Sequence, residues 1–216
     1  TWKKCVRRWT THVNPYTKLA WGSDPALFAV NLVNEENLTV MWNKHPDSAK
    51  LYTAKFAEWC QANGKQGKPN KTDPAFRAFL DDVQGKCLAE QMRFVKEDLK
   101  LKTLVTSLNF VNDVPLTLLR NEFDIVDNHS YFDHPGFPEK QWSLPFSFKQ
   151  DSAVKRMAAV PRNLMGTRIF GKPFMVTEFN YCFPNRYRAE GGALIGAYGA
   201  LQNWDALYRF GWSHSI

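Results

Sequence analysis

The segment LFAVNLVN, residues 27–34, has the nearly continuous apolar run of a buried β-strand. It ends in Asn34, and Glu35 and Glu36 follow directly. A carboxylate at the tip of a buried strand costs solvation free energy unless it is paired or used in chemistry. Glu35 is therefore a candidate functional residue, and the rest of the chain should show what it would act with.

Apolar runs and helical patterns alternate along the chain. Strand patterns cover residues 27–34, 103–110, 123–132, 172–181 and 206–214, and helical patterns cover residues 45–64, a segment that begins at Asp73 and Pro74, and residues 161–169 and 187–202. A further helical pattern starts at Trp2. Strands that are apolar on both faces and separated by helices predict an α/β fold with about five parallel strands.

The composition is that of a globular protein, with 44% hydrophobic and 23% charged residues in 216. The net charge is +7, but Lys and Arg are interleaved with Asp and Glu, so we expect no nucleic-acid partner. No apolar run reaches about 18 residues, so we expect no membrane partner. The widely spaced Cys5, Cys60, Cys87 and Cys182 predict free thiols, most of them packed inside the protein.

Residues 133–151, DHPGFPEKQWSLPFSFKQD, form an aromatic and Pro-rich connection. Structureless connections longer than about 12 to 15 residues are uncommon in compact domains and are often functional. We therefore expect a functional loop here, in which Trp142 is a candidate stacking surface for a ligand.

Polar and aromatic side chains cluster where the predicted strands end. They are Asn34, Glu35, Asn109, His129, Tyr131, Glu178, Trp212 and His214. In parallel α/β proteins ligands bind at the carboxyl ends of the strands, and in a (β/α)8 barrel that edge is the catalytic face. The pattern predicts one site that collects these residues.

Two of the predicted strands end in glutamates, Glu35 and Glu178. If the sheet curves as a barrel does, the two side chains face each other across its mouth. Two carboxyl groups about 5 to 5.5 Å apart are the arrangement that splits a glycosidic bond with retention of configuration. The sequence thus predicts Glu35 and Glu178 as catalytic residues.

Four motifs in this order resemble clan A of the glycoside hydrolases. Asn34-Glu35 is similar to the acid/base motif at strand four of that barrel, and VTEFN, residues 176–180, is similar to its nucleophile strand. His129-Ser130-Tyr131 resembles the sixth-strand motif, and FGWSH, residues 210–214, resembles the eighth strand. The segment NPYTKLAWGSDPALFAVNLVNEENL, residues 14–38, is most similar to family 5-like, cellulase-related proteins.

The resemblance implies that residues 1–216 are a single, incomplete (β/α)8 TIM barrel with the equivalents of strands four to eight. Nothing in the sequence corresponds to strands one to three or to helix eight. It further implies a secreted or periplasmic hydrolase, without a cofactor or metal, that acts on a β-linked polysaccharide or oligosaccharide.

The resemblance also implies the residue roles. Glu35 would be the acid/base and Glu178 the nucleophile, and Tyr131 would donate a hydrogen bond to the nucleophile. Asn34 would bind the sugar 2-hydroxyl, His129 would lie in the same polar network, and Trp212 would stack on the sugar. A negatively charged Glu178 would keep a neighbouring Glu35 protonated, so proximity would set the two roles.

Other readings of the same residues stay open. Glu35 could begin a solvated helix and Glu178 could be a framework residue. The chain could also be a catalytically silent, carbohydrate-binding fragment whose unpaired strand edges lead to self-association or to completion by another segment. A nucleic-acid-binding domain is the least favoured reading. His129, Asp133 and His134 do not match the spacing of a zinc motif.

Overall fold

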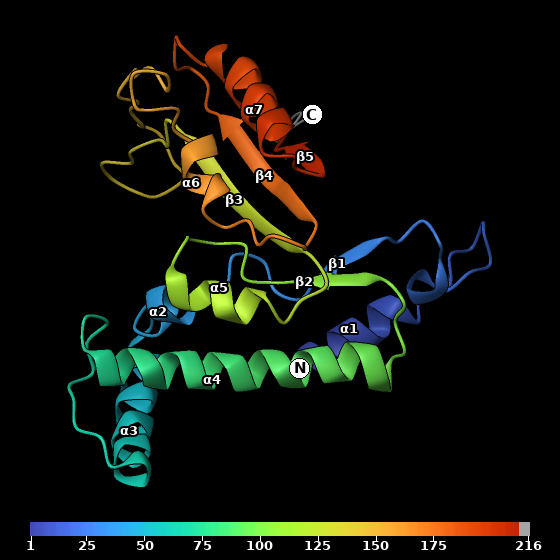
Figure 1. Cartoon of the computed structure of the whole chain (residues 1–216), viewed down its shortest axis with the longest axis vertical. Coiled ribbons are helices and arrows are strands. Elements are labelled where there is room, and N and C mark those ends of the chain that lie inside the picture. Colours follow the sequence, from blue (N-terminus) through green and yellow to red (C-terminus); the bar gives the residue numbers. More distant parts are fainter. Residues whose placement is uncertain (212–216) are drawn as a thin grey trace. The chain divides into compact units, whose positions relative to one another are not determined.

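The computed structural model describes residues 1–211 of the chain. These residues form two compact units (Figure 1): unit 1 covers Thr1–Thr106, and unit 2 begins at Ser107. The prediction that residues 1–216 form a single barrel domain stays a prediction.

Unit 1 consists mainly of helices with one short strand pair. Its elements are α1 (Trp2–Thr10), the 3-10 turn η1 (Trp21–Ser23), β1 (Ala29–Asn31), α2 (Leu38–Met41), α3 (Pro46–Asn63), α4 (Pro74–Arg93), the π-helical turn η2 (Phe94–Asp98) and β2 (Leu104–Thr106). β1 and β2 pair in parallel, with Ala29 opposite Leu104 and Asn31 opposite Thr106. Both strands are short, so most of the stability of unit 1 comes from its helices.

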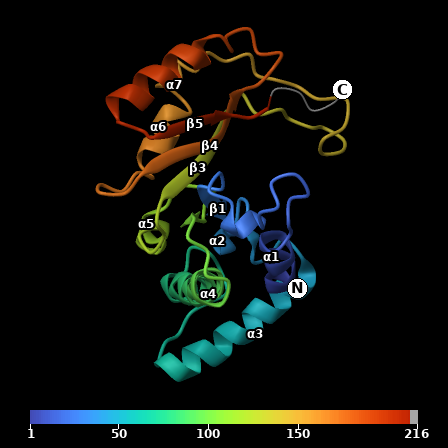
Figure 2. The ribbon, with the colours of Figure 1, turned by 90° about the vertical axis from the view of Figure 1, so that its right-hand side faces the viewer.

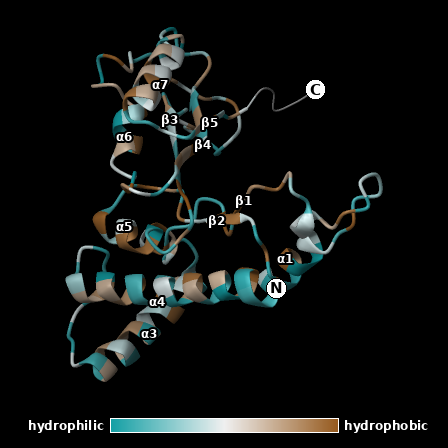
Figure 3. Cartoon of the chain, turned by 45° about the vertical axis from the view of Figure 1, so that its right-hand side comes forward, coloured by the Kyte–Doolittle hydropathy of each residue, from teal (hydrophilic) through white to brown (hydrophobic). Residues whose placement is uncertain are grey.

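Local sequence signals set the bounds of the two long helices. Asp73 caps α4, because its carboxylate accepts hydrogen bonds from the backbone amides of Ala75 and Phe76. Backbone hydrogen bonds from Lys68, Phe76 and Ala75 lower the pKa of Asp73. Pro74 occupies the first helical position, where no amide hydrogen is needed, and Gly64 ends α3 in the left-handed conformation. Figure 3 shows hydrophilic and hydrophobic residues alternating along α4.

The core of unit 1 is aromatic. The ring of Phe76 makes edge-to-face contacts with Trp42, at a centroid distance of 4.8 Å, and with Phe56, at 4.9 Å, a favourable geometry for aromatic pairs. Phe79 and Leu80 complete this cluster from the inner face of α4. This core lies between α3 and α4, which explains the helical spacing of the apolar residues in both segments.

Unit 2 is an α/β unit built on one parallel sheet. Its elements are α5 (Val114–Arg120), β3 (Val126–Phe132), α6 (Pro161–Met165), β4 (Phe174–Tyr181), α7 (Glu190–Leu201) and β5 (Ala206–Arg209), and the strand order is β3-β4-β5. Leu164 of α6 and Ile195 of α7 pack with Val126, Phe174 and Val176 of the sheet. α6 and α7 therefore cover one face of the sheet (Figure 2).

The prediction of a mixed α/β fold with five parallel strands is confirmed. The strands form two open sheets, of two and three strands, and within residues 1–211 neither closes into a barrel. The strands predicted at 27–34 and 103–110 were too long, since each has only three strand residues. Of the described residues in the strand predicted at 206–214, the four from Ala206 to Arg209 form β5. Helix α5 lies between the strands predicted at 103–110 and 123–132, where no helix was predicted, and α2 was not predicted either.

The long connection after β3 is irregular, as predicted, and hydrogen bonds hold it in place. The carboxylate of Asp133 accepts hydrogen bonds from the backbone of Gln150, at 2.9 Å, and from the side chain of Asn185, at 3.3 Å. Gly136 and Ser147 form an antiparallel bridge within the loop. These contacts bring the two ends of the loop together.

None of the described helices is both long enough and apolar enough to cross a membrane. All four cysteines are free thiols, as predicted. The prediction that most of them are packed is wrong, because Cys5 and Cys87 are exposed and Cys60 and Cys182 are only partly buried. Partial removal from water and the negative charge of Asp133 raise the pKa of the Cys182 thiol, which opposes formation of a reactive thiolate there. Cys87 is exposed as a residue, but partial desolvation and the negative charges of Glu36 and Glu90 raise the pKa of its thiol as well.

Candidate active site

The second half of the β3–β4 pair carries three of the predicted site residues: His129, Tyr131 and Glu178. Asn128 lies opposite Val176, but the next residue, His129, lies opposite Glu178. Thr177 is therefore the extra residue of a β-bulge in β4. A bulge locally breaks the alternation of side chains, so that two neighbouring residues can reach the same part of the partner strand.

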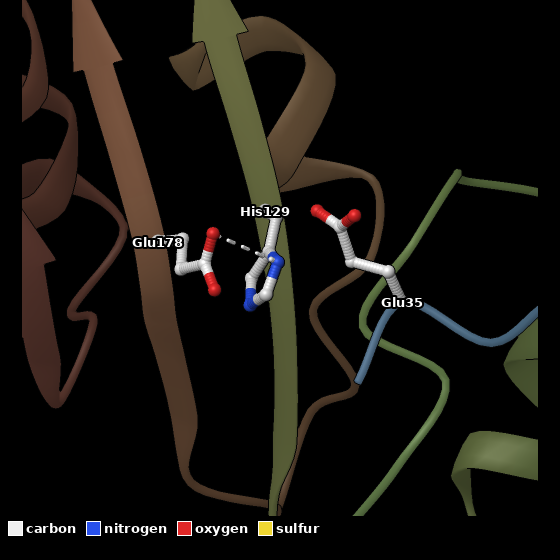
Figure 4. Close-up of side chains that lie close together, drawn as sticks. All are labelled: Glu35, His129 and Glu178. Carbon is white, nitrogen blue, oxygen red and sulfur yellow. Dashed lines mark ion pairs between the residues drawn. The ribbon is translucent and has the colours of Figure 1, made fainter. Parts of the chain in front are cut away.

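Glu178 faces two side chains of β3. The phenol of Tyr131 donates a hydrogen bond of 2.5 Å to Oε2 of Glu178, and Nδ1 of His129 lies 3.6 Å from the same oxygen. Figure 4 shows the carboxylate of Glu178 turned toward the imidazole. The His129 side chain is only 3% exposed, whereas that of Glu178 is 22% exposed. The carboxylate is thus oriented by the protein and still accessible to a ligand.

A second group of polar side chains lies on the other side of the His129 ring. Nε2 of His129 is 3.0 Å from Nδ2 of Asn109 and 2.9 Å from Oγ1 of Thr177. The hydroxyl of Thr177 donates a 2.6 Å hydrogen bond to Oδ2 of Asp127, and Asn109 donates to the same oxygen at 3.2 Å. Asp127 is fully buried, so these hydrogen bonds offset the cost of removing its charge from water.

Arg120 supports the segment that carries Asn109. Its guanidinium is fully buried and donates to the carbonyls of Leu108, at 2.6 and 3.0 Å, and of Val111, at 2.5 Å. Leu108 and Val111 both have a positive φ, near +66°, which is unfavourable for bulky side chains. Burial lowers the pKa of Arg120 to about 10, while the negative charges of Asp127 and Asp113 oppose this shift.

The structure brings four predicted residues together in unit 2: Asn109, His129, Tyr131 and Glu178. Glu35 and Asn34 belong to unit 1, where they follow β1. Glu35 has a left-handed backbone conformation, with φ of 51°, and its side chain is partly exposed, while Asn34 is exposed. Because the two glutamates belong to different units, their approach to one another stays a prediction.

Of the two tryptophans predicted to stack on a ligand, one lies in the part of the chain that the structure describes. Trp142 is 70% exposed in the long loop, and its ring contacts His134 and Phe137, with centroids 5.7 and 5.1 Å away. Neighbouring aromatic rings therefore hold a largely exposed tryptophan in place. Trp212 and His214 lie outside the described residues.

Sequence reasoning did not assign Asp127, Thr177 or Arg120 to the site. For Asp127 a signal existed, because it precedes His129 by two positions and thus lies on the same face of the strand. Nothing in the segment VTEFN marks the bulge that brings Thr177 to His129. Arg120 lies in α5, a helix that was not predicted from the sequence, so its burial could not be anticipated.

These observations define an α/β protein in which a carboxylate, an imidazole and a phenol meet on a parallel sheet. Such a cluster suits nucleophilic or acid–base chemistry by the carboxylate. Comparisons with known protein families, with characterised proteins and with solved structures find no match to this chain.

We expect Arg120→Ala to lower the free energy of unfolding by about 3 kcal/mol or more. The change leaves the carbonyls of Leu108 and Val111 without their charged donor and removes the positive charge near buried Asp127. Urea unfolding followed by tryptophan fluorescence measures the loss. Arg162→Ala, at an exposed position of α6, is the control and should change little. Equal stability of the Arg120→Ala variant and the wild type would contradict this role.

Proposed function

We propose that the chain is the catalytic segment of a retaining glycoside hydrolase that cleaves β-glycosidic bonds of a polysaccharide or oligosaccharide. The observation that carries the proposal is the contact of Glu178 with Tyr131 and His129 at the paired end of a parallel strand. A nucleophilic carboxylate must be held in one orientation and must also be reachable by the sugar, and Glu178 meets both requirements.

The reaction would proceed in two displacements. In the first, a carboxylate oxygen of Glu178 attacks the anomeric carbon while the bond to the leaving oxygen breaks and Glu35 gives its proton to that oxygen. The sugar is then joined to Glu178 as an ester, and the negative charge of Glu178 is gone. Glu35, now ionised, takes a proton from water as the water attacks the anomeric carbon and releases Glu178.

The surrounding side chains have distinct roles in this proposal. The phenol of Tyr131 holds Oε2 of Glu178, so that the other carboxylate oxygen can attack. Asn34 would bind the sugar 2-hydroxyl, and Trp142 and Trp212 would offer stacking surfaces to sugar rings. The resemblance to clan A extends the proposal to the fold, in which β1 to β5 would be strands four to eight of one (β/α)8 barrel.

The edge of β1 supports a second candidate function, that of a catalytically silent module completed by another strand. The carbonyl of Phe28 accepts from Leu104, and the amide of Leu32 donates to Thr106. The alternate residues Ala29 and Asn31 therefore turn their backbone groups away from β2. Such an edge is a template for pairing with another chain segment.

A cavity of about 690 Å³ lies beside this edge and is mainly apolar. It is lined by Trp2, Val6 and Trp9 of α1, by Trp21, and by Val30 of β1, among others. No residue of α1 is buried, although its apolar face is turned to the cavity. An extended segment with apolar side chains would satisfy both the backbone groups of β1 and this surface.

The test of the leading proposal is covalent labelling of the nucleophile. We expect aryl 2-deoxy-2-fluoro-β-glycosides of glucose, mannose or galactose to form a stable ester with Glu178, identified by peptide mass spectrometry. Glu178→Gln should lower turnover of aryl β-glycosides by about a thousandfold or more, because the amide cannot attack. The exposed Glu139→Gln is the control. Turnover by Glu178→Gln at the wild-type rate would refute the assignment.

The acid/base role of Glu35 has its own signature. With an activated aryl glycoside, Glu35→Ala should slow release of the sugar from Glu178, because no group activates water. Added azide should restore the rate and yield a β-glycosyl azide, since azide attacks without needing a base. The neighbouring Glu36→Ala should show neither effect. Azide-independent turnover in Glu35→Ala would contradict the role.

The second candidate predicts that the chain associates through β1. Asn31→Pro should shift the distribution toward monomer in light scattering, because proline removes the outward-facing donor and is poorly accepted in a paired strand. Asn31→Thr retains the donor and favours strand structure, so it should behave as the wild type. A wild-type chain that is monodisperse, monomeric and fully active would exclude this candidate.

A further inference from the structure

The β-bulge in β4 places two consecutive residues on either side of one imidazole. Thr177 contacts Nε2 of His129, and Glu178 lies opposite Nδ1. In a regular strand, side chains at neighbouring positions point to opposite faces of the sheet, so both could not reach the same ring. Because of the extra residue, side chains of β4 lie next to both ring nitrogens of His129.

The order of donors and acceptors follows from the shortest contact. An ionised Asp127 can only accept, so the hydroxyl proton of Thr177 points to Asp127 across 2.6 Å. The oxygen of Thr177 is then available as an acceptor for a proton on Nε2 of His129. When Nε2 carries no proton, it can accept from Nδ2 of Asn109 at 3.0 Å. In either state the Nε2 side of the ring has a fixed partner.

We propose that Thr177 and Asp127 are positioning residues that hold the imidazole of His129 with Nδ1 facing the carboxylate of Glu178. This inference rests on the proposed function, because it assigns the orientation of the nucleophile to a buried group behind it. Neither residue would touch the substrate. Thr177 contacts the ring, Asp127 orients the Thr177 hydroxyl, and the fully buried position of Asp127 excludes solvent from competing with that hydrogen bond.

Burial makes this support rigid. His129 also receives a backbone restraint, because its amide donates to the carbonyl of Asn109 at 3.1 Å. The ring is thus fixed at the main chain and at Nε2, which leaves little freedom for Nδ1. Because the neighbouring imidazole is fixed, Glu178 needs little rearrangement when the reaction begins. Residues that do not touch the substrate, such as Thr177 and Asp127, contribute to catalysis in this way.

The test compares Thr177→Val, which keeps the shape and removes the hydroxyl, with Thr177→Ser, which keeps the hydroxyl. In the full chain, nitrogen NMR reports the ring nitrogens of His129 without any substrate. We expect Thr177→Val to shift the Nε2 resonance of His129 and Thr177→Ser to leave it near the wild-type position. An unchanged Nε2 resonance in folded Thr177→Val would overturn the proposal.

The wild type provides a measurement that needs no variant. We expect the His129 ring nitrogens to differ from those of the exposed His45 and the Nε2 proton to exchange slowly when present. His129 resonances that match those of His45 and show fast ring rotation would overturn the proposal even if Thr177→Val fails to fold.

Kinetics separate this inference from the proposed function. With aryl β-glycosides, Thr177→Val should lower kcat by about tenfold or more and change KM little, and Thr177→Ser should retain most of kcat. Absence of glycosidase activity in the wild type would refute the proposed function while the NMR result would still decide the position of His129. Equal kcat in Thr177→Val and the wild type would refute the positioning role alone.

Discussion

The parallel pairing of β3 with β4, with one extra residue at Thr177, is the constraint on which the candidate site depends. Before the bulge, Val126 and Val176 point to the helices that cover the sheet. After it, His129 lies opposite Glu178 and the phenol of Tyr131 reaches the carboxylate. The backbone register of β3 and β4 thus sets which side chains can meet, and the side-chain hydrogen bonds then fix their exact positions.

The two faces of the sheet in unit 2 differ in a way that parallel sheets seldom do. One face is apolar and packs against α6 and α7. On the other face Asp127, His129 and Tyr131 follow one another at every second position of β3. Parallel strands are usually apolar on both faces, so a polar row at this place is costly unless it is hydrogen-bonded and used. The bonds of Asp127 to Asn109 and Thr177 meet the first condition.

The parts of the fold that could be predicted are those with local causes. Asp73 and Pro74 begin α4 and Gly64 ends α3, because capping and left-handed turns depend on the residues at those positions. The division of five strands between two sheets depends on contacts between distant segments, which periodicity does not contain. β1 and β2 were predicted too long for a related reason: apolar composition indicates burial but not how many residues find a partner.

The same distinction separates the site residues. His129, Tyr131 and Glu178 could be predicted, because polar groups at the ends of apolar runs are conspicuous. Thr177 could not, since one inserted residue leaves no mark in composition. Arg120 could not, because its three hydrogen bonds go to carbonyls whose unusual backbone angles exist only in the folded chain.

The bulge also bears on how the gene for this protein can change. Thr177 is the residue that the bulge adds to β4, so loss of its codon would restore regular alternation and leave Glu178 opposite His129. Such a deletion would keep the carboxylate on its face and remove the contacts of Thr177 with His129 and Asp127. Evolution could therefore shorten β4 at this codon without moving the carboxylate to the helix-covered face, and only the support behind the imidazole would be lost.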